Sequence, residues 1–443
     1  MAREGGGRGA RASLLTPLRI PAFRRLWAAD VISLLGDWAG RLALTVIVLE
    51  RTGSPAWAAG VTAVSLAGYV GIGQVLATLA DRRGRIAVML GADLVRAGLF
   101  GLMLLDVPVG AMLALAFLAG LAAPPFEAAR SAAIPDVVTG PEYGDALALA
   151  GISVQASIVV GNALGGGLLV LVGAKAALAI NALTFLVSAL LVLGLRDTPA
   201  AAPSGGHAGV RGSLRAGFDD LFGDRMVRRA LCLITITGAL GTVDEALVVP
   251  YADRVGISQG FLGLLAAAVP LGTIVVTTLI PTKGDHRRLL RGAALCSALT
   301  AAAAAPLFFL EVGSIGAFAA FFISGGMFAI SIPTNVVIGT RLQRGTRASA
   351  MGIAVGILMG SQALGAAVGG VAASWVGPPL AISSALVLAS AFSLWALVTT
   401  PYEAKHLARR ARSRAMEPDE PDTVIDLTDP APVPSRPLVA AAS

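Results

Sequence analysis

The chain has 443 residues, of which 56% are hydrophobic and only 14% are charged, and its mean hydropathy is +0.77. Soluble domains carry about 25% charged residues, so this composition excludes an ordinary soluble protein and indicates a membrane protein. The three histidines lie in polar segments, and Cys232 and Cys296 lie in apolar runs. The sequence therefore predicts neither a metal site nor a disulfide framework.

The first twenty residues are rich in Arg and Gly and contain no apolar segment, so residues 1–21 are predicted to form a cytoplasmic tail, not a cleaved signal. From there to residue 400, apolar stretches long enough to cross a bilayer follow one another with short loops. The predicted fold class is an all-α membrane protein with about twelve transmembrane helices. We place them at residues 26–50, 56–80, 86–105, 109–129, 144–171, 176–195, 230–250, 260–281, 289–310, 314–338, 349–375 and 379–399.

Lys and Arg are distributed unevenly between the two sides of this predicted bundle. With the N terminus inside, most of the 34 Lys and Arg lie on one side, and only Arg51, Lys175 and Arg254 lie on the other. Because basic residues favour the cytoplasmic side, both termini are predicted to be cytoplasmic and the protein to lie in the inner cell membrane as a multi-pass protein. The net charge of +7 follows from this topology, and no basic stripe with aromatics indicates a nucleic-acid partner.

The two halves of the chain resemble each other. Short matches, such as Asp81 with Asp285 and Leu178 with Leu380, recur at a near-constant offset of about 200 residues. Such an offset predicts two pseudo-symmetric six-helix bundles, as in transporters built from parallel repeats. The predicted domains are the tail 1–21, a bundle over 22–197, a cytoplasmic linker over 198–227, a bundle over 228–400 and a disordered cytoplasmic tail over 401–443.

Within the linker, four apolar residues fall on one helical face. They are Leu214, Phe218, Leu221 and Phe222. This pattern is typical of a helix that lies at the membrane interface, although a solvated linker would be equally compatible with it.

Several motifs resemble those of a known family. The loop Leu79–Arg85 is similar to the major facilitator signature between helices two and three, and Gly161–Gly166 is similar to the antiporter signature, with Asn162 in the place of its proline. Four segments resemble the enterobactin-exporter and macrolide-efflux branch: Phe23–Trp27, Ser33–Asp37, Ile134–Val138 and Thr184–Ala189. The resemblance covers nearly all of residues 20–400 and implies two bundles that export a drug-like molecule against protons.

Charged residues inside predicted spans are the sharpest functional indication, because burying an unpaired charge in a membrane is costly. Asp30, Asp37 and Arg41 lie in the first span, and Asp37 and Arg41 are four residues apart, so they can pair. Both a structural ion pair and a role in proton or substrate coupling are open for them. The repeat offset places Glu245 opposite Arg41. Asp244 and Glu245 lie toward the outer end of the seventh span, where desolvation could raise the pKa of a carboxylate and let it carry a proton. A water-exposed position at the mouth of a cavity is the alternative, and we favour it for Asp244.

A second set of charges is expected to form a cytoplasmic gate. Asp93 and Arg96, three residues apart, predict a local pair, and Glu127 could join the network through Arg130. In the resembled family, the loop aspartate, here Asp81, lies at the start of the eleventh helix. The gating candidates are Asp81, Arg82, Gly84, Arg85, Asp93, Arg96, Glu127 and Arg130.

The fifth predicted span carries a glycine motif. Gly161 and Gly165 form a small-xxx-small surface that lets a neighbouring helix approach closely, with Asn162 and Gly166 beside them. Close helix packing is the general meaning of this pattern, and in the resembled family the surface seals the outside.

The leading functional hypothesis is a monomeric transporter that exports a lipophilic small molecule, with the proton gradient as its energy source and no other cofactor. An uptake symporter of the same fold and a non-transport scaffold or receptor are the alternatives, because fold alone does not set function. The sequence carries no Gly-rich phosphate loop, metal-ligand spacing or nucleophile–base pattern, so an enzyme is not predicted.

Overall fold

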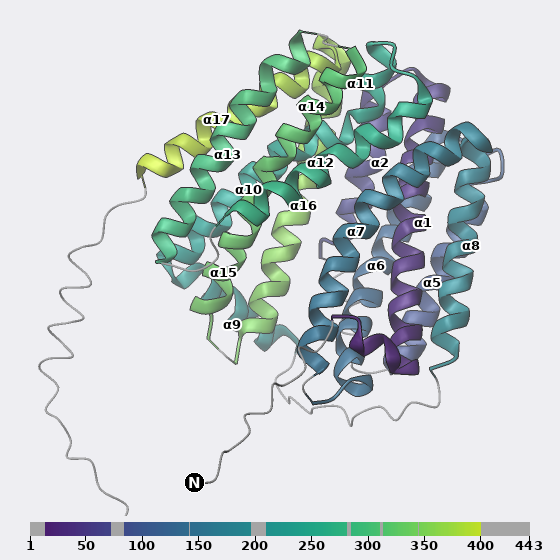
Figure 1. Ribbon diagram of the computed structural model, residues 1–443, viewed down its shortest axis with the longest axis vertical. Coiled ribbons are helices and arrows are strands. Elements are labelled where there is room, and N and C mark those ends of the chain that lie inside the picture. The colour runs from purple at the N-terminus through teal and green to yellow at the C-terminus, as the bar shows by residue number, and fades with distance from the viewer. Residues whose placement is uncertain are drawn as a thin grey trace, which may run out of the picture. The chain divides into compact units, whose positions relative to one another are not determined.

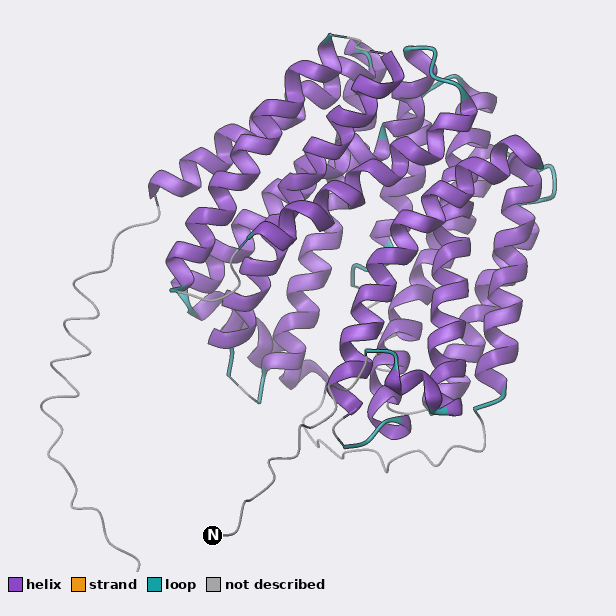
Figure 2. Cartoon of the chain, viewed as in Figure 1, coloured by secondary structure: helices purple, strands orange, loops and turns teal. Residues whose placement is uncertain are grey.

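A computed structural model describes residues 14–71, 84–140, 142–195, 210–280, 285–310, 313–343 and 345–399. All regular secondary structure in these ranges is helical (Figure 2). Within them, ten helices are long and apolar enough to cross a membrane. The predicted all-α membrane fold is therefore confirmed. The distal part of the second predicted span, the loop with Asp81 and Arg82, residues 198–209 of the linker and the tail 401–443 lie outside the described residues.

The helices of the first half follow the short helix η1 (Thr16–Arg19). They are α1 (Pro21–Thr52), α2 (Pro55–Ala67), α5 (Arg85–Leu102), α6 (Val109–Val137), α7 (Glu142–Leu171) and α8 (Gly173–Leu193). Helix α1 begins with Pro21, which needs no hydrogen bond for its nitrogen, and ends at Gly53, whose φ of 62° few other residues adopt. It packs on α7 and α8, while α5 packs on α6 and α8 (Figure 1).

The second half begins with α9 (Val210–Gly223), within the predicted linker. It continues with α10 (Arg225–Ala246), α11 (Val248–Arg254), α12 (Gln259–Leu279), α13 (His286–Phe309), α14 (Gly313–Gly325), η2 (Gly326–Ile330), α15 (Ser331–Arg341), α16 (Arg347–Val376) and α17 (Pro378–Thr399). Helix α13 packs on α17, α10 on α16, and α12 on α14.

Two predicted spans are interrupted. The span expected at 314–338 consists of α14 and α15 with the 3-10 turn η2 between them. Next to this turn α14 lies close to α12: a Cβ on Gly325 would lie 2.0 Å from the carbonyl oxygen of Val269. The span expected at 230–250 ends at Ala246, and the short helix α11 follows after Leu247.

The linker helix α9 packs against the start of α16. Leu221 is fully buried in an apolar cluster with residues of α10, α13, α15 and α16, and a Cβ on Gly217 would lie 2.5 Å from Ser349 Oγ. Phe218 is 51% exposed, and its ring contacts the ring of Phe222 at a tilt of 34°. The apolar face predicted for this segment is therefore divided between the bundle and the surface.

The halves touch at the side of the bundle where α1 ends, which we call the opposite side; the side where α1 begins is the basic side. There α7 packs on α12, and α2 packs on α16 (Figure 1). Gln259 Nε2 lies 3.4 Å from Glu50 Oε1, and a Cβ on Gly370 of α16 would lie 2.6 Å from that of Ala59. These contacts close the opposite side between the two halves.

Candidate functional site

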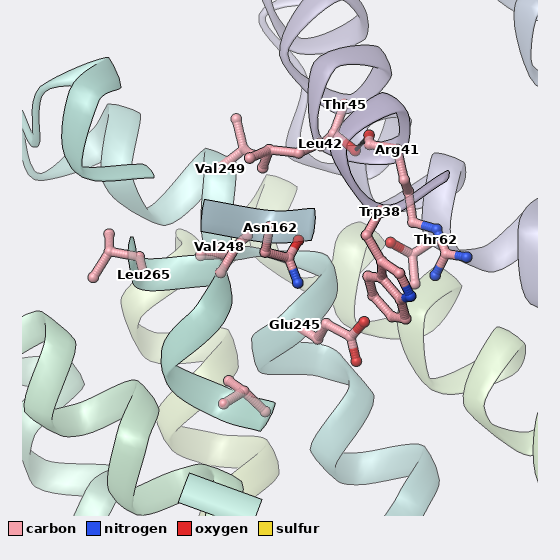
Figure 3. Close-up of a pocket in the computed structure, with 12 residues that line it drawn as sticks. Trp38, Arg41, Leu42, Thr45, Thr62, Asn162, Glu245, Val248, Val249 and Leu265 are labelled. Carbon is pink, nitrogen blue, oxygen red and sulfur yellow. Dashed lines mark hydrogen bonds between the residues drawn. The ribbon is translucent and has the colours of Figure 1, made fainter. Parts of the chain in front are cut away.

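A pocket lies where the two halves meet, between α1, α2, α7, α10, α11 and α12 (Figure 3). Its lining is mainly apolar, with a few polar or charged side chains at one end. The lining residues are Trp38, Arg41, Leu42, Thr45, Thr62, Asn162, Glu245, Val248, Val249, Leu265, Ala266 and Val269. The space that it leaves free is small, about 30 Å³. Its apolar wall with a few convergent polar groups has the chemistry of a small-molecule site, and a drug-sized ligand needs the two halves to move apart.

Arg41 and Glu245 lie in this one pocket although they are far apart in the sequence. Their side chains both point toward the Trp38 indole (Figure 3). The Arg41 guanidinium carbon lies 4.4 Å from the centre of the Trp38 ring, which is a cation–π contact. Trp38 was not among the sequence-predicted site residues; its position one helical turn before Arg41 was the available signal.

Asp37 lies at the middle of α1 between two arginines. Its Oδ2 is 3.8 Å from Arg41 Nη2 and 3.1 Å from Arg96 Nη2 of α5. Arg96 also lies over the ring of Phe185 in α8, 4.1 Å from its centre. The predicted Asp37–Arg41 pair is present, and the shorter contact joins α1 to α5.

Asp93 and Arg96 do not form the expected direct ion pair, although the Arg96 charge acts on the Asp93 carboxylate. Asp93 is fully buried and accepts a hydrogen bond of 2.6 Å from the Ser188 hydroxyl of α8, whereas Arg96 pairs with Asp37. The two side chains are three residues apart on α5, but each meets a closer partner on a neighbouring helix. Ser188 was not predicted, because an isolated serine in an apolar span carries no distinctive pattern.

The Arg130 charge acts on Glu127, as expected, but the direct contacts of the two residues join other helices. Arg130 Nη1 lies 3.1 Å from Oδ2 of the buried Asp30, which ties α6 to α1. The Tyr69 hydroxyl, beyond the end of α2, donates to Glu127 Oε1 at 2.5 Å. Asp30 therefore belongs with the gating candidate Arg130 in the structure, and Tyr69 is a partner that the sequence did not reveal.

Gly84 and Arg85 lie where α5 begins on the basic side. Gly84 has a φ of 82°, a conformation that favours glycine, and no atom of the described residues lies within 4 Å of a Cβ placed there. Arg85 forms an ion pair with Asp136 near the end of α6. The arrangement of Asp81 and Arg82 lies outside the described residues.

Asp244 does not lie in water. It is 1% exposed, and among the described residues neither carboxylate oxygen has a hydrogen-bond partner. Its neighbour Ser324 donates its hydroxyl to the carbonyl of Phe321. The exposed position expected for Asp244 is wrong because the broken tenth span covers this end of α10.

The glycine motif of α7 contacts two different helices. A Cβ on Gly161 would lie 2.9 Å from the carbonyl oxygen of Leu35 in α1, and one on Gly165 would lie 2.9 Å from the Cα of Ala39. Gly166 faces α12 instead, where its Cβ would lie 2.4 Å from the nitrogen of Gly263. Asn162 lines the pocket and is 6% exposed.

On the basic side, Asp224 caps α10. Its Oδ1 accepts a hydrogen bond of 2.6 Å from the Met226 amide, and its Oδ2 lies 2.8 Å from Arg341 Nη1. Partial burial acts to raise the pKa of the Asp224 carboxyl, but its hydrogen bonds and the Arg341 charge outweigh this, so the pKa is lowered from 3.8. No cluster of three or more metal-binding side chains occurs in the described part of the chain.

Comparison with solved structures shows the same fold. The chain has a TM-score of 0.64 with the nucleoside transporter NupG at 15% identity, covering 86% of this chain and 97% of that one. Its TM-score is 0.68 with a bacterial homologue of the human lysosomal transporter Spinster, in an inward-facing and unoccupied conformation. The identity is 16%, and the match covers 88% of this chain and 98% of that one. With a transporter of the POT family in complex with 5-aminolevulinic acid, the TM-score is 0.70 at 11% identity, and the match covers 86% of this chain and 96% of that one.

No curated protein matches the chain in sequence. A sequence model of the Major Facilitator Superfamily matches residues 26–355, which is most of the chain. Together with the helical architecture and the pocket between the two halves, this match shows that the chain belongs to the Major Facilitator Superfamily of membrane transporters.

Proposed function

We propose that this transporter exports a lipophilic small molecule, such as a drug, a macrolide or a siderophore-like product, in exchange for protons. The supporting observation is the pocket between the halves. Its wall of Leu42, Val248, Val249, Leu265 and Val269 suits an apolar body, while Arg41, Glu245 and Trp38 gather at one end.

The transport cycle would alternate between closure on the opposite side and closure on the basic side. The contacts of α7 with α12 and of α2 with α16 would separate to release substrate on the opposite side. In the same proposal, both termini face the cytoplasm, the protein lies in the inner membrane, and one chain is sufficient for transport.

Proton coupling is assigned to Asp37. A proton on its carboxylate would weaken both ion pairs, to Arg41 and to Arg96, and so loosen α1 from α5. Asp30, Asp244 and Glu245 are further carboxylates of the spans that could carry a proton. The ion pairs Asp30–Arg130 and Arg85–Asp136 would hold the helices of the first half together near the basic side.

The test is transport in vesicles of known orientation, after a panel of lipophilic toxins has been screened against a strain that lacks the gene. Export in exchange for protons predicts that inside-out vesicles with an acidic lumen accumulate the substrate, and that an uncoupler abolishes accumulation. Uptake into right-side-out vesicles driven by an inward proton gradient would instead indicate a symporter. The absence of transport in both orientations would favour a scaffold or receptor.

A further inference from the structure

Glu245 is the charged group of the pocket that has no partner. It is half-buried at the pocket wall. Among the residues that the structure describes, none forms a hydrogen bond or an ion pair with its carboxylate, and Arg41 acts on it only by attraction over a longer distance. A carboxylate left this way in a mostly apolar site is costly unless a ligand or a proton compensates for it.

Arg41, in contrast, is already engaged. Its guanidinium lies 3.8 Å from Asp37 and covers the Trp38 ring at 4.4 Å. An anionic ligand would have to compete with Asp37 for this arginine and would meet the carboxylate of Glu245 on the other side of the indole (Figure 3). The pocket therefore disfavours an anion.

The remaining polar groups of the pocket carry no charge. The Thr45 hydroxyl donates to the carbonyl oxygen of Arg41 at 2.9 Å, and Thr62 and Asn162 are buried neutral side chains. The apolar wall from α11 and α12 contributes area for binding but cannot distinguish the sign of a ligand's charge. The choice between a cation and an anion then depends on Glu245, with the indole of Trp38 beside it as a surface that favours cations.

We propose that the pocket takes a lipophilic cation, an amphiphile whose ammonium or other onium group lies between Glu245 and Trp38 while its apolar body lies against α11 and α12. This assignment names the substrate class of the exporter proposed above and rests on that function.

The experiment uses the full chain, purified in detergent, with two probes of matched size and opposite charge. Radiolabelled tetraphenylphosphonium is measured by equilibrium dialysis, and tetraphenylborate is measured in the same way. We expect the cation to bind about tenfold more tightly than the anion, and Glu245→Gln to remove this preference. Asp253→Asn, which neutralises an exposed carboxylate on α11 that does not line the pocket, is the control and should leave both affinities unchanged.

Each other outcome separates the two proposals. Equal or tighter binding of the anion, a Glu245→Gln variant that keeps the preference, or no binding of either ion to monodisperse protein would overturn the substrate class. Because binding in detergent needs no gradient, a charge preference that depends on Glu245 without any transport in vesicles would leave this assignment standing while the export function fails. If neutral compounds are exported by the proton gradient and Glu245→Gln does not change this export, the export function stands while the proposed substrate class fails.

Discussion

Asp37 shows how a single side chain can couple a charge to the packing of helices. It forms ion pairs with Arg41 on its own helix and with Arg96 on α5, and its side chain is only 20% exposed. Asp37→Asn removes the charge with little change in shape. We expect proton-driven accumulation of substrate to fall to background while exchange of substrate down its gradient continues, measured in proteoliposomes with and without a pH gradient.

The matched control is Asp106→Asn. Asp106 also forms an ion pair, with Arg51 at 2.9 Å, but its side chain is 89% exposed. Exposed ion pairs contribute about 0–1 kcal/mol to the stability of the folded protein, so this variant should transport as the wild type does. If Asp37→Asn still concentrates substrate against a gradient, Asp37 is structural and Glu245 is the next carboxylate to test.

At the scale of helices, Gly166 is where α7 of the first half meets α12 of the second. Its missing side chain allows backbone contact, since a Cβ would lie 2.4 Å from the Gly263 nitrogen. Overpacking of such a contact costs roughly 1–3 kcal/mol. We therefore expect Gly166→Leu to disfavour closure on the opposite side and to lower the transport rate about tenfold.

The neighbouring position supplies the control for this prediction. A Cβ on Gly167 would meet no atom of the described part of the chain within 4 Å, so Gly167→Leu should leave transport unchanged. Labelling of a single cysteine at position 259 by a membrane-impermeant thiol reagent reports whether the opposite side is open. Equal labelling and equal transport in both variants would show that this helix contact does not limit closure.

Helix α10 depends on its cap at Asp224. Loss of a capping side chain costs about 0.5–2 kcal/mol, and Asp224→Ala also removes the ion pair to Arg341. We expect a lower thermal unfolding temperature for Asp224→Ala in detergent, and no change for Asp219→Ala, an exposed carboxylate on α9.

The pH dependence of this difference has a defined sign. The pKa of Asp224 is lower in the folded chain than its ordinary value of 3.8, so its contribution is present above that value and is lost as the pH falls through the folded pKa. The unfolding temperatures of the wild type and of Asp224→Ala should therefore differ fully at neutral pH and become equal only at strongly acidic pH. A difference that disappears near pH 6 would contradict this account.

At the scale of the whole molecule, alternating access requires the opposite side to open. Glu50 and Gln259 bridge the two halves there, with 3.4 Å between Oε1 and Nε2. In a background without Cys232 and Cys296, a short reducible cross-linker between cysteines at positions 50 and 259 should arrest transport, and reduction should restore it.

A cross-link within one half is the comparison. Cysteines at Arg51 and Asp106, which form an ion pair in the first half, should be cross-linked without loss of transport. Continued transport with the 50–259 pair fully cross-linked would mean that the halves do not separate on this side, and it would exclude the proposed cycle.

The sequence by itself determined the helical membrane fold, the approximate positions of the spans and the need for close packing at Gly161 and Gly165. These features are local: the length of an apolar segment and the absence of a side chain act in the same way whichever helix lies beside them. The repeat offset also related Arg41 to Glu245, because equivalent positions of two repeats face a common axis.

Only the tertiary structure decided which charges on different helices meet. Spacing along one helix suggested that Asp93 pairs with Arg96, whereas the structure joins Arg96 to Asp37 and Asp93 to Ser188. The partner of a buried charge depends on how each helix is rotated and tilted against its neighbours, and that is set by packing, not by hydropathy. The burial of Asp244 has the same cause, because the covering segment is distant in sequence and is broken by η2.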